Sequence, residues 1–283
     1  LYNEQLTGVA GEVEYSVDGN GYVITGTEKV TKQPKDGVDL TLTIDKRLQT
    51  YLESLVSEVD KKYQPVQMTA MLVDPKTGNI VAATQRPTYN STTKEGIDVQ
   101  WNNLLTDQAY EPGSTMKVLA LAAAINEGVF DPNEKYKSGS VKIYTDLVRD
   151  YNKVGWGNIT YLEGLAHSSN VAFVYIIQKI GIEKWKQYLE AFGFGKSTNS
   201  GFANEISGSN PFNSYLQQLS TGFDQGITVT PYQMMQAFTA IANGGQMQKL
   251  RLVDHLTDPD TGKETPNPTT SLGKVITPET AKK

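Results

Sequence analysis

The feature that most constrains this chain is a serine followed three positions later by a lysine, at the start of a strongly apolar helix. Ser114 and Lys117 come directly after the turn residues 111–113 (EPG) and lead into residues 118–124 (VLALAAA). Such a run predicts a buried helix, and side chains three positions apart share one of its faces. Because desolvation lowers the pKa of a lysine, Lys117 could act as a base for the Ser114 hydroxyl. The pattern predicts nucleophilic serine chemistry without a catalytic histidine.

The spacing Ser-x-x-Lys has little specificity by itself. Two further copies lie at residues 91–94 (STTK) and 271–274 (SLGK), in polar or Pro/Thr-rich surroundings without an apolar helix. We interpret both as coincidences in loops. The alternative interpretation of Ser114 is a helix N-cap, with Lys117 extending its amine to solvent.

A second signal is the triplet Ser168, Ser169 and Asn170. It lies between residues 160–166 (TYLEGLA) and 171–177 (VAFVYII), which both read as helix. The triplet therefore predicts a short corner that joins two helices and aims a hydroxyl and a carboxamide into a shared cleft. Alternatively, one of the serines merely caps the second helix. Another Ser-x-Asn, at residues 197–199 (STN), lies in a polar loop and shows how common the triplet is.

Three segments, taken in order, resemble the transpeptidase domain of class B penicillin-binding proteins. They are residues 111–117 (EPGSTMK), 167–170 (HSSN) and 225–231 (QGITVTP). The resemblance runs from about Gly8 to the last residue and is greatest to the division-type, 2x-type proteins of Gram-positive bacteria. It implies the mixed α/β (α+β) fold of serine β-lactamases and penicillin-binding transpeptidases, an antiparallel sheet flanked by helices. It also implies that residues 1–36 are the tail of a pedestal (dimerisation) domain and that residues 37–283 begin the transpeptidase domain.

The resemblance assigns a role to each motif residue. Ser114 is the nucleophile that attacks the penultimate D-Ala carbonyl of a peptidoglycan stem peptide, and Lys117 is its activating base. Ser168 passes the proton toward the leaving amine, and Asn170 orients the substrate amide. A neighbouring strand's amine then takes the acyl group and closes a cross-link. β-Lactam antibiotics, which mimic acyl-D-Ala-D-Ala, would acylate the same serine.

Further residues and partners follow from the same resemblance. The predicted substrate-binding residues are Ser169, Trp101 and Gln225. For Trp101 the alternative is an aromatic ring tucked under a loop, and for His167, beside the triplet, it is a packed residue at a helix end. The expected partners are peptidoglycan stem peptides and β-lactams, with division proteins as further candidates. Similar proteins are anchored by one N-terminal helix, so we expect the domain at the extracytoplasmic face of the cell membrane.

The chain departs from the family pattern in two places. The family's third motif, Lys-[Ser/Thr]-Gly, belongs on a strand well downstream of the triplet, but the only such sequence here is residues 76–78 (KTG). Those residues are upstream, between two apolar runs, where they predict a hairpin turn. Since the chain stops just after a helix start at Thr277–Pro278, we expect a fragment, inactive alone unless a companion C-terminal fragment supplies the motif. The second departure is Asp224, where the family usually has glycine.

Composition excludes several other functions. The 26 basic and 31 acidic residues give a net charge of −5 without any basic run, which disfavours nucleic-acid binding. Cysteine is absent, so disulfides and thiolate catalysis are excluded, and His167 and His255 are too far apart in sequence to suggest a metal site. The chemistry implies no cofactor. No apolar run of 18 residues suggests a membrane span within the chain.

Three other functions stay open at this point. A serine β-lactamase shares the Ser-x-x-Lys and Ser-x-Asn motifs but needs a base for deacylation, and the sequence shows no candidate for such a base. A β-lactam sensor would also be acylated stably, but would lack the pedestal residues before Gly37. A scaffold for division partners would not depend on the Ser114 hydroxyl.

Overall fold

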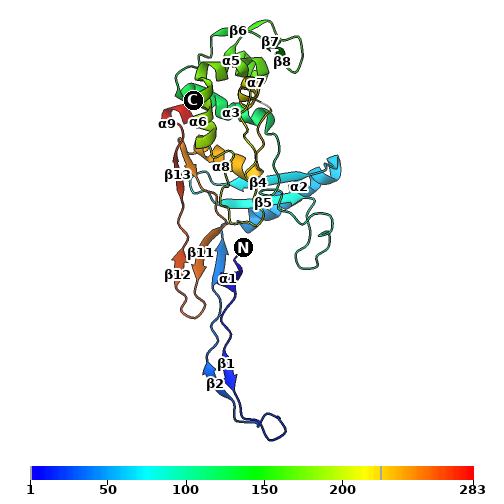
Figure 1. Ribbon diagram of the computed structural model, residues 1–283, viewed down its shortest axis with the longest axis vertical. Coiled ribbons are helices and arrows are strands. Elements are labelled where there is room, and N and C mark those ends of the chain that lie inside the picture. The colour runs from blue at the N-terminus through cyan, green and yellow to red at the C-terminus, as the bar shows by residue number, and fades with distance from the viewer. Residues whose placement is uncertain (1, 224) are drawn as a thin grey trace. The chain divides into compact units, whose positions relative to one another are not determined.

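The computed structural model describes residues 2–223 and 225–283 and shows two compact units (Figure 1). Asp224 lies outside the described residues. One unit combines residues 2–43 with Arg251–Pro268, and the other combines Ile44–Leu250 with Thr269–Lys283. The expected boundary after residue 36 thus differs from the observed grouping, in which a late segment joins the N-terminal one. The assignment of residues 1–36 to a pedestal domain stays a prediction.

The first unit consists of short strands with little core. Its elements are α1 (Asn3–Leu6), β1 (Glu12–Glu14), β2 (Lys29–Lys32), β3 (Asp39–Leu42), β11 (Val253–Thr257) and β12 (Glu264–Pro266). Strands β1 and β2 pair antiparallel, and β11 lies between β12 and β3 in a three-stranded antiparallel sheet. The pairing of β3 with β11 explains why residues 251–268 belong here. Since every residue of β1, β2 and β12 is exposed, apolar burial contributes little to this unit.

The second unit begins with a helix packed against a hairpin. Helix α2 (Lys46–Tyr63) starts after Asp45, whose carboxylate accepts hydrogen bonds from the backbone N–H groups of Arg47 and Leu48. Strands β4 (Met68–Val73) and β5 (Ile80–Arg86) pair antiparallel. Leu52 and Val56 of the helix bury their side chains against Ala82 of β5. Residues 76–78 form the hairpin turn, as expected of a sequence that is not the third motif.

The remaining elements of this unit are mostly helices joined by small hairpins. The helices are the 3₁₀ turn η1 (Gly113–Thr115), α3 (Met116–Asn126), α4 (Tyr161–Ala166), α5 (Asn170–Ile180), α6 (Ile182–Ala191), α7 (Tyr215–Ser220), α8 (Pro231–Ala242) and α9 (Pro278–Ala281). The strands are β6 (Lys135–Lys137), β7 (Ser140–Ile143), β8 (Asp146–Arg149), β9 (Asn158–Thr160), β10 (Gln246–Gln248) and β13 (Ser271–Lys274). They pair as β6–β9, β7–β8 and β10–β13, each antiparallel.

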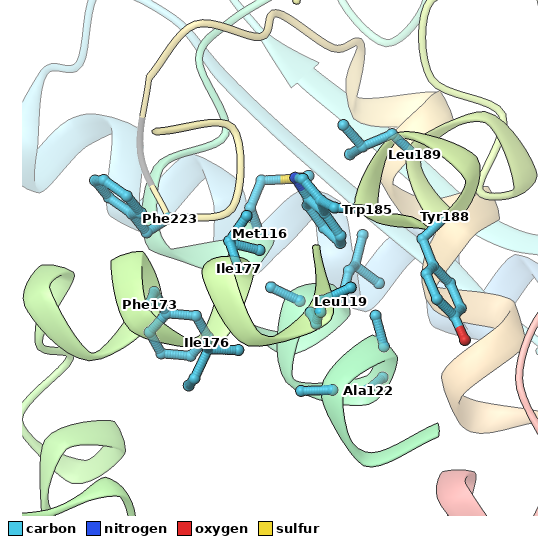
Figure 2. Close-up of a cluster of buried hydrophobic side chains, with 14 of the residues drawn as sticks. Met116, Leu119, Ala122, Phe173, Ile176, Ile177, Trp185, Tyr188, Leu189 and Phe223 are labelled. Carbon is cyan, nitrogen blue, oxygen red and sulfur yellow. The ribbon is translucent and has the colours of Figure 1, made fainter. Parts of the chain in front are cut away.

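The main hydrophobic core is built by α3, α5 and α6 (Figure 2). Met116 and Leu119 of α3 meet Phe173 and Ile177 of α5, and all four side chains are fully buried. Trp185 of α6 is also fully buried, and its indole N–H donates to the Thr221 hydroxyl at 2.8 Å. A close-packed interior holds its side chains in fixed positions. This core therefore fixes α3 relative to α5, the two helices that carry the predicted motifs.

One sequence interpretation needs correction. Residues 271–274 are not a loop but strand β13, which pairs with β10. The register shifts within this pair, so that Ser271 lies opposite Gln248 and Lys274 lies opposite Gln246. This copy of Ser-x-x-Lys therefore lies on a strand and does not open a buried helix as Ser114 and Lys117 do. The copy at residues 91–94 does lie in a turn.

Candidate active site

Ser114 lies in η1, the 3₁₀ turn that leads into α3. Gly113 directly before it has φ of +59°, a left-handed conformation that a glycine adopts without steric cost. The Thr115 hydroxyl donates to the carbonyl oxygen of Pro112 at 2.6 Å and closes the turn. The Ser114 side chain is exposed, while Met116 and Lys117 behind it are buried. The local sequence thus presents a hydroxyl on top of a rigid, buried helix.

Lys117 is buried, with 3% of its surface exposed, and its amine reaches the triplet at residues 168–170. Its Nζ donates to the carbonyl oxygen of Ser168 at 2.7 Å, to the Ser168 hydroxyl at 3.0 Å and to Oδ1 of Asn170 at 2.8 Å. Nζ also lies 5.6 Å from the centre of the Phe173 ring. A buried amine requires such partners. The alternative in which Lys117 extends to solvent is wrong.

The triplet is the predicted corner between two helices, α4 and α5. The N–H of Ser168 donates to the carbonyl of Leu165, and the N–H of Ser169 donates to the carbonyl of Gly164. This pair of bonds is the Schellman motif, in which glycine normally occupies the left-handed position. Here Ser168 occupies that position, with φ of +53°.

The hydroxyl of Ser168 links the nucleophile to the lysine. Ser168 Oγ lies 3.2 Å from Ser114 Oγ and 3.0 Å from Lys117 Nζ. The amide nitrogen of Asn170 donates to the carbonyl of Arg149 at 3.2 Å, which fixes the face that the carboxamide presents to Lys117. Ser114, Lys117, Ser168 and Asn170 therefore form one hydrogen-bonded cluster. The sequence predicted these four residues, and the structure brings all of them together.

Ser169 does not fit the substrate-binding role that the sequence suggested. Its side chain is fully buried, and its hydroxyl accepts the N–H of Ala172 at 3.0 Å as the N-cap of α5. The same hydroxyl donates to Oδ1 of Asp150 at 2.8 Å. Because solvent does not reach it, Ser169 holds the corner in place instead of contacting substrate.

Asp150 is the residue that sequence reasoning missed. Its carboxylate, 1% exposed, accepts from the Ser169 hydroxyl, from the N–H of Val171 at 3.1 Å and from the N–H of Gly139 at 2.7 Å. These bonds tie the end of β8 to the start of α5 and so position Ser168 and Asn170. No local pattern marks a lone aspartate 18 positions before Ser168. The only available signal was an acidic residue between segments that read as strand and turn.

Two other predicted residues stay outside the cluster. Trp101 is 63% exposed and lines a separate hollow, so it is not tucked under a loop as the alternative had it. Gln225 is exposed, and its backbone N–H donates to the carbonyl of Ser220 at 3.3 Å. Their contact with substrate stays a prediction. His167 stacks on Trp156 with ring centres 4.3 Å apart, which confirms its interpretation as a packed residue at a helix end.

The described residues also bear on metal binding and membrane insertion. Among residues 2–223 and 225–283, no group of three or more histidine, aspartate or glutamate side chains is placed to hold a metal ion. In the same part of the chain, no helix combines the length and apolarity that a membrane crossing requires.

The fold and the cluster define a family, and comparison with known proteins agrees. Residues 68–283 match the family model described as the penicillin-binding protein transpeptidase domain. The chain therefore belongs to the penicillin-binding protein transpeptidase family, with the fold that the sequence motifs implied.

Individual members of the family show how similar this chain is to known proteins. The chain is 33% identical over 290 residues to stage V sporulation protein D of Bacillus subtilis, and this alignment covers 99% of this chain and 45% of that protein. It is 28% identical over 297 residues to the peptidoglycan D,D-transpeptidase MrdA of Escherichia coli, covering 94% and 44% respectively. The crystal structure of penicillin-binding protein 2X from Streptococcus thermophilus superimposes with a TM-score of 0.90 at 36% identity, over 99% of this chain and 42% of that one. The predicted similarity to the 2x type is confirmed, and the chain spans less than half the length of these proteins.

Proposed function

We propose that this chain carries the acyl-serine half-site of a peptidoglycan D,D-transpeptidase. The observation that supports this most directly is the chain of contacts from Ser114 Oγ through Ser168 Oγ to Lys117 Nζ, with distances of 3.2 and 3.0 Å. A nucleophilic serine needs a base within hydrogen-bond reach or one relay away. This cluster provides such a base without a histidine.

The three contacts of the lysine suggest how the proton moves. A neutral amine has two N–H donors and one lone pair. In the neutral form, the carbonyl oxygen of Ser168 and Oδ1 of Asn170 can take the two donors while the lone pair accepts from the Ser168 hydroxyl. Hydroxyl hydrogens rotate freely, so Ser168 can accept the proton of Ser114 while it gives its own to Lys117.

The reverse transfer completes acylation. As the Ser114 oxygen bonds to the substrate carbonyl carbon, the C–N bond to the terminal D-Ala breaks. The departing amine takes a proton from Ser168, which is replenished from Lys117. The acyl group stays on Ser114 until the amine of a second stem peptide attacks it and closes the cross-link. In this scheme the backbone N–H of Ser114, in the 3₁₀ turn η1 that leads into α3, supplies half of an oxyanion hole.

The partners follow from the chemistry. Peptidoglycan stem peptides are the acyl donor and acceptor, and β-lactams acylate Ser114 as substrate mimics. We place the domain at the extracytoplasmic face of the cell membrane, where these peptides are found, with an anchor helix outside this chain. Division proteins and a companion fragment that carries the third motif are the further partners we propose.

The test is the intact mass of the folded 283-residue chain before and after exposure to benzylpenicillin. We expect the fragment, although inactive alone as a transpeptidase, to form a stable penicilloyl adduct at Ser114, located by peptide mapping, and the Ser114→Ala variant to form none. A folded wild-type chain that stays unmodified would contradict acylation by this chain. An adduct that disappears within minutes as hydrolysed penicillin accumulates would instead support a β-lactamase.

A further inference from the structure

The hollow that Trp101 lines lies on the surface of the larger unit, outside the Ser114 cluster. It has a volume of about 310 Å³, within the range of ligand-binding pockets. Its walls come from α2, from the end of β5 and from the irregular segment between β5 and η1. Trp101 and Tyr89 contribute aromatic rings, and Asn102 and Asn103 contribute amides. None of the four residues of the Ser114 cluster lines it.

Two aromatic rings of this hollow are exposed. Trp101 is 63% exposed and Tyr89 is 36% exposed. Among the described residues, the indole N–H of Trp101 and the hydroxyl of Tyr89 have no recorded hydrogen-bond partner. An exposed large ring with an unused donor is characteristic of surfaces that bind a partner.

The polar groups have unused hydrogen-bonding capacity as well. The side-chain oxygen of Asn102 is buried without any partner among the described residues, and such an atom needs an explanation. Asn103 uses its side-chain oxygen to accept the N–H of Leu105 at 3.1 Å, while its amide N–H groups have no recorded partner in the described chain. Asn102 and Asn103 both line the hollow, and they contribute one acceptor and amide N–H donors that no described residue uses.

The hollow has no uncompensated charge. Glu53, the carboxylate in its wall, pairs with Arg86 at 2.7 Å, and the Arg86 side chain is only 12% exposed. A phosphate or carboxylate ligand would therefore find no free cation, and a cationic ligand would compete with Arg86. The preferred ligand is neutral, rich in hydrogen-bonding groups and flat on one face.

The wall that carries the amides is held rigidly. The Gln85 side chain donates to the carbonyl of Asn102 at 3.0 Å and accepts the N–H of Leu104 at 2.9 Å. These bonds fasten the segment after β5 to the strand itself. A preorganised wall loses less conformational entropy when a ligand binds.

We propose that this hollow binds an N-acetylated hexosamine, as part of the glycan strand that carries the stem peptides. A pyranose ring presents C–H groups to an aromatic face and hydroxyls at its rim, which suits Trp101 and the amides. An acetamido group matches the amides of Asn102 and Asn103, and its methyl group can lie against Ala83 and Leu105. The proposal rests on the proposed function, because it names the part of peptidoglycan that a site outside the Ser114 cluster would hold.

The experiment titrates the 283-residue chain with a peptide-free N-acetylglucosamine tetrasaccharide and follows tryptophan fluorescence. Trp185 is fully buried and Trp156 stacks on His167, so Trp101 is the exposed reporter. The measurement uses the Ser114→Ala variant, which keeps the hollow but removes acylation, so that failure of this proposal and failure of the proposed function are distinguishable. In variants that lack the Trp101 indole, and hence the fluorescent reporter, the affinity is measured by isothermal titration calorimetry.

We expect saturable binding that Trp101→Ala weakens by about tenfold, the equivalent of one lost aromatic contact. Trp101→Phe should restore most of the affinity, which separates ring stacking from misfolding. Tyr51→Ala is the matched control, because Tyr51 is 64% exposed on α2 and does not line the hollow. A tetrasaccharide of glucose, which lacks acetamido groups, should bind more weakly.

Three results would overturn the proposal. The first is no binding of the tetrasaccharide, and the second is equal loss of affinity in Trp101→Ala and Tyr51→Ala. The third is binding of a sugar-free stem peptide that Trp101→Ala abolishes, which would make the hollow a peptide subsite.

Discussion

Two loops of this protein contain a Ser-x-Asn triplet, and they differ in which hydroxyl groups donate hydrogen bonds to a nearby carboxylate. In the corner at Ser168–Asn170, Asp150 takes only the middle hydroxyl, that of Ser169, and the flanking side chains face Lys117. In the loop at residues 197–199, Glu205 accepts from the hydroxyls of Ser197 and Thr198 and from that of Ser200 just beyond.

Both loops also contain a residue in the left-handed conformation. Ser168 has φ of +53° and Asn199 has φ of +52°. Each loop therefore has a left-handed residue, the first of the triplet in one and the third in the other, and a supporting carboxylate, and neither feature makes a site. The difference is the buried lysine from α3, since only the first loop lies where packing against α5 delivers an amine. The comparison teaches that the chemistry depends on which hydroxyls the carboxylate leaves available.

The largest effect should come from removing that amine. In Lys117→Ala the Ser114 hydroxyl loses the end of its proton path, and we expect acylation by benzylpenicillin to slow by about a thousandfold. Lys117→Arg should not restore the rate, because a guanidinium does not deprotonate in proteins. Stopped-flow measurement of the acylation rate tests this, with circular dichroism as the control for folding. A Lys117→Arg variant with near wild-type rates would contradict the assignment of Lys117 as base.

The next largest effect should distinguish the carboxylate of Asp150 from that of Glu205 by the acylation rate. Asp150→Asn replaces one acceptor oxygen by a donor and misplaces the corner, so we expect acylation to fall on the order of 100-fold. Glu205→Gln makes the matching change in the other loop and should leave the acylation rate within about twofold, since substitutions far apart act independently.

Stability measurements on the same pair provide the control. Each substitution leaves an N–H or hydroxyl donor without its acceptor, which costs about 1–3 kcal/mol of unfolding free energy. If both variants lose stability to a similar degree and only Asp150→Asn loses acylation, the positioning role of Asp150 is supported. Equal losses of acylation would show that the rate reports general destabilisation.

A smaller difference should appear at the two left-handed residues. Glycine pays no steric cost there and alanine does, so Ser168→Gly should be more stable than Ser168→Ala by about 1 kcal/mol. Asn199→Gly should exceed Asn199→Ala by a similar amount. Urea denaturation of the four variants measures this. A Gly–Ala stability difference at only one of the two positions would show that the loops do not share backbone strain. Acylation should fall in both Ser168 variants and in neither Asn199 variant, because only the Ser168 hydroxyl lies on the proposed proton path.

The smallest effect concerns acid stability of the second loop. Burial acts to raise the pKa of Glu205, but hydrogen bonds from Thr198 and Ser200 outweigh it and hold the pKa below 4.5. Because a lowered folded-state pKa stabilises the protein above the unfolded value, this contribution is lost as pH falls from about 4.5 through the folded pKa. Unfolding midpoints of wild type and Glu205→Gln, taken between pH 7 and pH 3, should therefore converge on acidification. A constant difference would contradict the prediction.

Local sequence was enough for the elements whose signals are local. The apolar run after Lys117 predicted α3 and the helix start at Thr277–Pro278 predicted α9. The cap of α2 at Asp45 is a local signal of the same kind, since a helix start depends on residues within one turn. The hairpin turn at residues 76–78 was equally readable from neighbouring residues. In contrast, the strand at residues 271–274 depends on pairing with β10, and its own composition resembles a loop.

The sequence by itself determined the proposed reacting groups of this protein, Ser114 and Lys117 near the start of one buried helix, because their relation is fixed by their close spacing along the chain. The motifs at Ser168 and Asn170 were recognisable through family resemblance, but their contact with Lys117 spans 51 and 53 positions. Only the packing of α3 against α5 decides that contact. Tertiary structure alone revealed Asp150, the burial of Ser169 and the hollow beside Trp101, because each depends on neighbours that are distant in sequence.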